Sequence, residues 1–151
     1  MFKADVDLRN YLVGNTSPPD SVIDVPFDSG QFFLGAFPDF TEVNQDVLVR
    51  VRLLSTVPNT KWLRDEVTVA FSVMGADRSK YVQTQDLSYS IFNTLLASNR
   101  VENDDHVYFQ FGSNSGPRFI GYQDNSKPLF DSIITLYVDG LEDRFNRKTL
   151  Y

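Results

Sequence analysis

The stretch from Val67 to Leu96 constrains the fold of this chain most strongly, because two different hydrophobic periodicities follow one another there. From Val67 to Met74 apolar residues alternate with small or polar ones, as in a strand with one apolar face. Beyond a turn at residues 75–78, apolar residues recur at the spacing of an amphipathic helix over about 80–97. This apolar stripe consists of Leu87, Ile91 and Leu95, widened by Tyr81, Phe92 and Leu96. The stretch predicts a strand that feeds a helix, with the two apolar faces packed on each other.

Both ends of this helix carry candidate signals. Either Asp77 or Ser79 is placed to accept backbone N–H bonds at its start, and the sequence leaves this choice open. Asn99, just after the last residue of the apolar stripe, is a candidate left-handed C-terminal stop.

The remaining elements are predominantly strands. We expect a short N-terminal helix at 5–13, a Pro-rich connection at 15–28, a loop at 56–65, a turn or loop at 112–117 and an amphipathic C-terminal arm at 141–151. The further predicted strands are 31–37, 46–55, 107–111, 118–122 and 129–138. Because only one helix links strands, the sequence predicts a single α+β domain over 1–151, with a mostly antiparallel sheet of four to five strands covered by the two helices.

The charge balance argues against tight binding to nucleic acid or to an anionic membrane. The formal net charge is −6 and the isoelectric point is near 4.6, and Lys and Arg form no dense cluster. The first residues lack the basic and apolar regions of a signal peptide, and no run of apolar residues is long enough to span a bilayer. We therefore expect a protein that is neither exported nor membrane-spanning. The 13 Phe residues exceed what a core of this size needs, which favours a protein partner.

No catalytic or cofactor signature is present in the sequence. Cysteine is absent, which excludes disulfides and thiolate metal sites, and none of the common nucleotide, nucleophile-elbow or zinc motifs occurs. His106 follows Asp104 and Asp105, a context more typical of a solvated histidine than of a catalytic one. Asn103, Asp104 and Asp105, and likewise Asp5 and Asp7, could supply oxygen ligands but lack the spacing of a calcium loop. The sequence therefore predicts no enzyme, no metal and no cofactor.

The candidate functional residues are contact residues. Arg50 and Arg52 share one face of the strand 46–55, where they are either solvated or paired with carboxylates of a neighbouring strand or subunit. Trp62 is either a contact anchor in the loop 56–65 or folds back onto the edge of the core. Arg118, in the C-terminal half, and Phe145, in the C-terminal arm, complete the set.

Two segments resemble a known family, the tail terminator or tail-completion proteins of long-tailed bacteriophages. The first is the strand, turn and helix of residues 67–96, VTVAFSVMGADRSKYVQTQDLSYSIFNTLL. The second is GPRFIGYQDN at 116–125, followed by PLF and the strand SIITLYVD, which is similar to the family's closing hairpin. The resemblance covers residues 31–140 in order and spacing, although the N-terminal helix is shorter here and the Pro-rich connection is longer.

The resemblance implies a structural role at the head–tail junction of the virion, with assembly in the host cytoplasm. The expected partners are further copies of the chain in a ring, most simply hexameric, the tail tube protein, and a head-completion or neck protein. DNA would pass through the ring without specific binding, in keeping with an acidic exterior. Ring closure needs heterologous contacts, for which the face with Arg50 and Arg52, the Trp62 loop and the loop at 112–117 are candidates.

Two alternatives stay open. The first is a head-completion or neck ring protein of the same junction, which would bind the portal-side complex instead of the tube protein. The second is a small-ligand-binding or enzymatic α+β domain with a pocket between the helix and the sheet. Thr84, Ser88 and Ala97 are small enough to leave such a pocket, but residues of this kind more often allow a helix to pack closely on a sheet.

Overall fold

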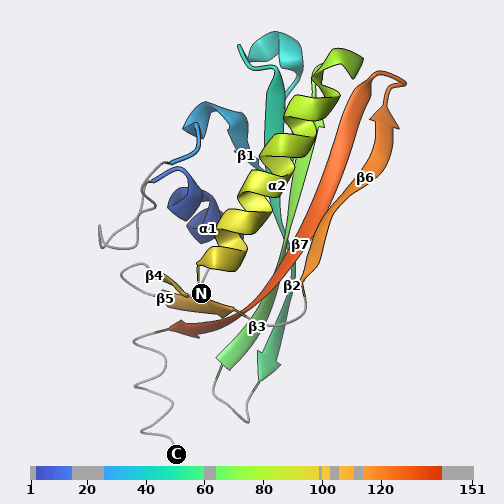
Figure 1. The fold of residues 1–151 in the computed structure, drawn as a ribbon. Helices are drawn as coiled ribbons and strands as arrows, with labels where there is room; N and C mark the ends of the chain where they lie inside the picture. Colours follow the sequence, from blue (N-terminus) through green and yellow to red (C-terminus); the bar gives the residue numbers. More distant parts are fainter. Residues whose placement is uncertain are drawn as a thin grey trace, which may run out of the picture.

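A curled, mostly antiparallel sheet of seven strands carries the fold, with a long and a short helix packed on it (Figure 1). The computed structural model describes residues 3–14, 26–59, 64–98, 100–102, 106–110 and 114–140. The helices are α1 (Ala4–Leu12) and α2 (Tyr81–Ala97), and the strands are β1 (Phe32–Leu34), β2 (Val47–Asn59), β3 (Arg64–Gly75), β4 (Arg100–Glu102), β5 (His106–Gln110), β6 (Ser115–Gln123) and β7 (Lys127–Gly140). The predicted α+β class is confirmed, with more strands than the four to five expected.

Strand β7 organises the sheet, because it pairs with three other strands. One of its edges pairs with β3 over most of its length, and its other edge pairs first with β6 and then with β5. The strand order is β1-β2-β3-β7-β5-β4, and β6 branches from β7. All pairings are antiparallel except that of β1 with β2. The long β2–β3 hairpin extends beyond the region covered by the helices (Figure 1).

The core lies between the helices and one face of the sheet. The odd-numbered residues of β2 as far as Val51, the odd-numbered residues of β3 and the even-numbered residues of β7 point toward the helices, because the register aligns them across the strands. The buried side chains on this face are Val47, Val49, Val51, Val67, Val69, Phe71, Val73, Phe130, Ile134, Leu136 and Val138. The strand predicted from the alternation at Val67 to Met74 is thus confirmed, and its apolar side is the core side.

Helix α2 packs unusually close to the sheet at Gly75, the last residue of β3. A Cβ atom on Gly75 would lie 2.5 Å from the Oγ1 of Thr84 and 3.0 Å from the Cβ of Lys80. Thr84 and Ser88 are fully buried on the sheet side of the helix, together with Ile91. The small residues of α2 therefore serve close packing here, because a ligand at Gly75 would have to displace the helix.

The start of α2 and the packing of α1 depend on side-chain hydrogen bonds. Asp77 accepts a hydrogen bond from the backbone N–H of Ser79 at 2.9 Å and so caps a 3₁₀ turn that leads directly into α2. The hydroxyls of Tyr11 and Ser98 lie 2.7 Å apart and connect α1 to the end of α2. The hydroxyl of the buried Tyr108 donates to the carboxylate of Asp7, and burial and this carboxylate raise the pKa of Tyr108.

Several predicted loop boundaries are wrong. The predicted loop at 56–65 is strand at 56–59 and at 64–65, and the predicted turn at 112–117 belongs to β6 from Ser115 onward. The predicted strand 31–37 is reduced to Phe32–Leu34, and β4 was not predicted. Leu96, predicted to widen the apolar stripe of α2, is exposed instead.

Some predictions fall outside the described residues. These are Trp62, Asn99, the candidate ligands at 103–105, Phe145 with the arm 141–151, and the Pro-rich connection except residues 26–28.

Candidate subunit interface

The face of the sheet that points away from the helices gathers three of the predicted contact residues. We call it the open face and define it by two rows of side chains that the register aligns across β2, β3, β7 and β6. The first row is Arg50, Ser72, Asp131 and Arg118, and the second is Arg52, Ala70, Ile133 and Ser115. Arg50 and Arg118, distant in sequence, thus lie in one row, about 14 Å apart at the usual spacing of strands.

The first row is joined by hydrogen bonds. An Nη2–H of Arg50 donates to the Oγ of Ser72 at 3.2 Å, and the Oγ of Ser72 donates in turn to the carboxylate of Asp131. Ser72 is fully buried, so its hydroxyl depends on these two partners. Arg118 lies directly opposite Asp131 on the neighbouring strand and is exposed.

Positive charge is in excess within the two rows of the open face. Within the two rows three arginines accompany a single carboxylate, that of Asp131, although the whole chain has a net charge of −6. Burial and the nearby charge of Arg52 lower the pKa of Arg50, and Asp131 acts in the opposite direction. The Nε atoms of Arg50 and Arg52 are buried and find no hydrogen-bond partner within the described part of the chain. Arg118 is the exposed arginine of the two rows, so this face can accept a further carboxylate there from outside the subunit.

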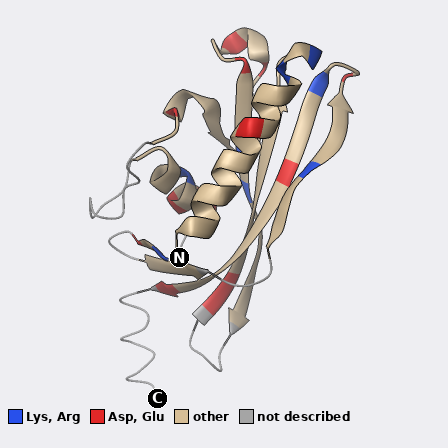
Figure 2. Cartoon of the chain, in the orientation of Figure 1, with Lys and Arg blue, Asp and Glu red and all other residues tan. Residues whose placement is uncertain are grey.

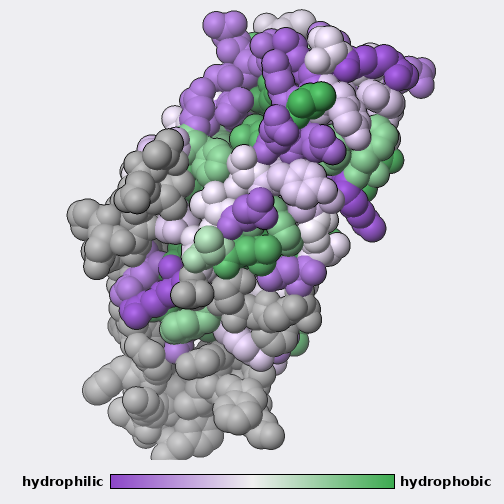
Figure 3. Space-filling model, viewed as in Figure 1, coloured by the Kyte–Doolittle hydropathy of each residue, from purple (hydrophilic) through white to green (hydrophobic). Residues whose placement is uncertain are grey.

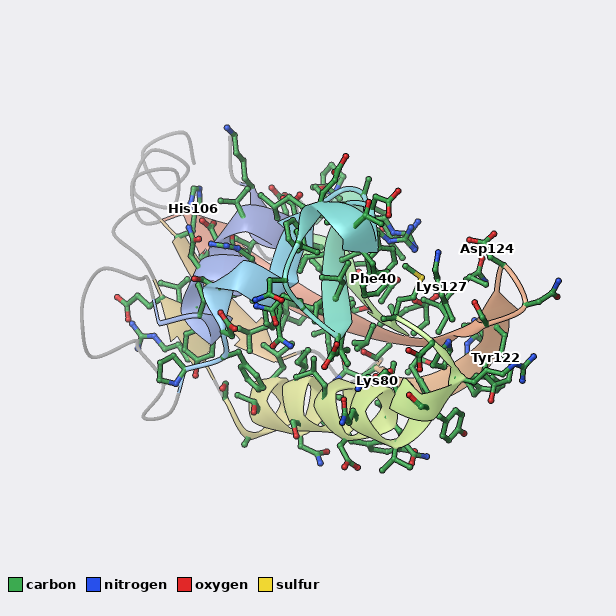
Figure 4. The ribbon with its side chains drawn as sticks, turned by 90° about the horizontal axis from the view of Figure 1, so that it is seen from above. Phe40, Lys80, His106, Tyr122, Asp124 and Lys127 are labelled. Carbon is green, nitrogen blue, oxygen red and sulfur yellow. The ribbon has the colours of Figure 1, made fainter. Side chains whose placement is uncertain are left out.

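The segment between β1 and β2 covers one end of the open face. The guanidinium of Arg50 lies over the ring of Phe37, with its central carbon 4.8 Å from the ring centroid. The ammonium of Lys127 lies 6.0 Å from the ring centroid of Phe40 and 3.2 Å from the carboxylate of Asp124. Figure 4 shows Phe40 and Lys127 close together, with α2 on the other side of the sheet. The second row, in contrast, lies outside these contacts.

A second surface, which the sequence reasoning missed, runs along the outside of α2. We call it the outer stripe of α2. It consists of Val82, Asp86, Tyr89, Asn93 and Leu96, all exposed. Its apolar members follow one another at intervals of seven residues, on the side of the helix opposite Ile91 and Leu95. That spacing is visible in the sequence and was the available signal.

Further exposed apolar residues occur at the end of the β2–β3 hairpin and on β6. They are Leu53, Leu54 and Val57 on the hairpin and Phe119 and Ile120 on β6. Phe119 is held within an aromatic cluster, since its ring lies 5.3 Å from those of Tyr81 and Phe130 and 5.2 Å from that of Tyr122. The hairpin residues flank the segment 60–63 that contains Trp62.

The comparisons with known proteins give no family assignment. No protein-family model matches the chain, and no curated protein matches its sequence. Within the described ranges, no helix is long and apolar enough to cross a membrane, and no group of three acidic or histidine side chains is placed to hold a metal ion.

Proposed function

We propose that this protein is a structural subunit of a long-tailed bacteriophage, a tail terminator that closes into a ring, most simply of six copies. In this role the ring ends polymerisation of the tail tube and provides the surface on which head and tail join. The resemblance of residues 31–140 to that family motivates the proposal, and the α+β fold agrees with the order of elements on which the resemblance rests.

The observation that supports ring formation most directly is the arginine-rich open face of an otherwise acidic subunit. A ring needs a surface on each subunit that meets a different surface on its neighbour. Arg50, Arg52 and Arg118 offer planar guanidinium groups to such a contact, and only Asp131 balances them within their two rows.

The excess of arginine also indicates where the open face lies in the ring. It favours a position between subunits and disfavours a position on the wall of the central channel. In a ring of six copies, three arginines per subunit on the channel wall would form a dense cationic surface. Such a surface binds the DNA backbone through counterion release and would hinder its passage. Burying these arginines between subunits leaves the acidic residues to determine the charge of the channel.

The test combines assembly with tail binding. Light scattering of the purified protein over a wide concentration range, with electron microscopy of the same samples, is expected to give a mass rising toward six subunits and rings with a central hole. Purified tail tubes mixed with the protein are expected to carry a cap at one end and to stop growing. Binding to the portal-side complex but not to tubes would instead identify a neck protein, and binding to neither would refute the proposed function.

A small-molecule binding function is less well supported. The position where the sequence suggested a pocket, next to Thr84 and Ser88, is filled by the close approach of α2 to Gly75. A thermal-shift screen with metabolites checks this directly, because a ligand that binds only the folded protein raises its melting temperature.

A further inference from the structure

The outer stripe of α2 has the composition of a contact surface rather than of a solvated helix face. Val82, Tyr89 and Leu96 are 60%, 45% and 40% exposed. Asp86 is the only charged residue among the 17 residues of α2. Figure 2 shows this single acidic band on the front of the helix, and Figure 3 shows pale and green surface interrupted by purple patches over the same region. Solvated helix faces normally carry several charges, whereas interface centres are depleted of them.

We propose that the outer stripe of α2 docks on the open face of a neighbouring copy of this chain, with Asp86 directed at the arginines there. This inference rests on the ring in the proposed function and names the two surfaces that meet. It makes the contact heterologous, as a ring requires, because the helix layer of one subunit covers the sheet layer of the next.

Charge complementarity indicates that the outer stripe of α2 contacts the open face of the neighbouring copy. The outer stripe has one carboxylate and no cation, and the two rows of the open face have three arginines and one carboxylate. A symmetric contact between two α2 stripes would bring two carboxylates and no cation into the interface, which is unfavourable. Docking on the open face instead gives Arg52 or Arg118 a partner from outside its own subunit.

The two surfaces also match in size. A helix of 17 residues is about 26 Å long. The four strands of the open face span about 14 Å between their outer axes and present side chains along several residues of each strand. A helix laid across them would reach the partly exposed Ile133 and the exposed Ser115 of the second row, beyond the contacts of Phe37 and Phe40. The sheet of each subunit would then have a helix on both faces: its own α2 on one face and the α2 of the neighbouring copy on the open face.

Charge reversal tests the contact. Asp86→Arg is expected to raise the dissociation constant for self-association by about tenfold or more, measured by light scattering, because it opposes an arginine-rich surface. Combining it with Arg52→Glu or with Arg118→Glu is expected to restore association in at least one of the two double variants. Asp5→Arg in α1, which changes the net charge equally and lies outside both surfaces, is expected to leave the dissociation constant unchanged. Circular dichroism establishes that each variant is folded.

The outcomes separate this inference from the proposed function. An unchanged dissociation constant in Asp86→Arg, or rescue by neither arginine reversal, overturns the contact while wild-type rings and tube capping leave the proposed function standing. A wild-type protein that is monomeric at every concentration also overturns the contact. A protein that self-associates with the expected rescue but caps no tail tube supports the contact and refutes the terminator role.

Discussion

Replacing Arg50 and Arg52 one at a time by glutamine should give different stabilities, although the two arginines lie only two residues apart on β2. Arg50 donates a hydrogen bond to Ser72 and stacks over Phe37, whereas Arg52 makes no hydrogen bond, ion pair or ring contact within the described residues. A hydrogen bond from a charged group contributes about 1.5 kcal/mol at the lower end. A partly exposed cation–π contact adds about 0.5 kcal/mol or slightly more.

These contributions predict that Arg50→Gln lowers the free energy of unfolding by about 2 kcal/mol, and that Arg52→Gln changes it by less than about 0.5 kcal/mol. For a domain of this length, the first loss corresponds to a fall in melting temperature of about 4–8 °C. Urea unfolding followed by circular dichroism measures both, at a concentration where light scattering gives the monomer, because assembly raises apparent stability.

A double variant that includes Ser72→Ala tests whether the stabilisation by Arg50 depends on its hydrogen bond within the first row. If Arg50 stabilises the fold through Ser72, then Arg50→Gln and Ser72→Ala together should cost less than the sum of the two single changes. Equal losses in Arg50→Gln and Arg52→Gln, or strict additivity with Ser72→Ala, would refute the view that the first row is an internal network and the second a free surface.

Three further outcomes are expected. Gly75→Ala should lower the free energy of unfolding by about 2 kcal/mol, since its Cβ would meet Thr84 at 2.5 Å, and Thr84→Ala in the same chain should recover part of this loss in urea unfolding. Above about pH 10 stability should fall, because the raised pKa of Tyr108 keeps its phenol protonated in the folded state while the unfolded chain ionises; an identical pH profile for Tyr108→Phe would contradict this. Arg50→Glu with Arg52→Glu should leave a folded but less stable monomer that fails to form rings, and unchanged light scattering would count against the open face as an interface.

The strongest sequence patterns predicted the central strand and helix correctly, because burial enforces both periods. The alternation from Val67 to Val73 is required by a sheet with one covered face, and the positions of Ile91 and Leu95 are required by the helix that covers it. The face shared by Arg50 and Arg52 was predicted for the same reason. Their row partner Arg118 was a separate candidate, since the pairing of β6 with β7 is a long-range register that periodicity does not encode.

The loop predictions failed where proline was taken as a stop signal. Pro58 lies in β2 opposite Asp65, and within the described residues β1 pairs with β2 only near Val49 to Val51. One edge of β2 is therefore unpaired at Pro58, and proline is tolerated in edge strands. Pro117 lies in β6 at the register shift between Ser115 and Arg118, another position that needs no ladder hydrogen bond.

The outer stripe of α2 was missed because Leu96 was assigned to the core by its nearness to Leu95. Counting from Val82 instead places Tyr89 and Leu96 on the same outward line, with Asp86 between Val82 and Tyr89. The structure turns this line away from the sheet.

The open face and the outer stripe of α2 need opposite surface properties. The open face must keep its arginines ionised and accessible, and the serine bridge from Arg50 to Asp131 fixes one of them while Arg52 and Arg118 remain available. The outer stripe must stay apolar without causing uncontrolled aggregation, and Asp86 near its N-terminal end favours partners that offer a cation. Because each surface opposes a second copy of itself, head-to-tail contact is the mode of self-association that both favour. Whether such contacts close into a ring or continue as a filament depends on the angle between the two layers, and the proposed terminator function requires closure.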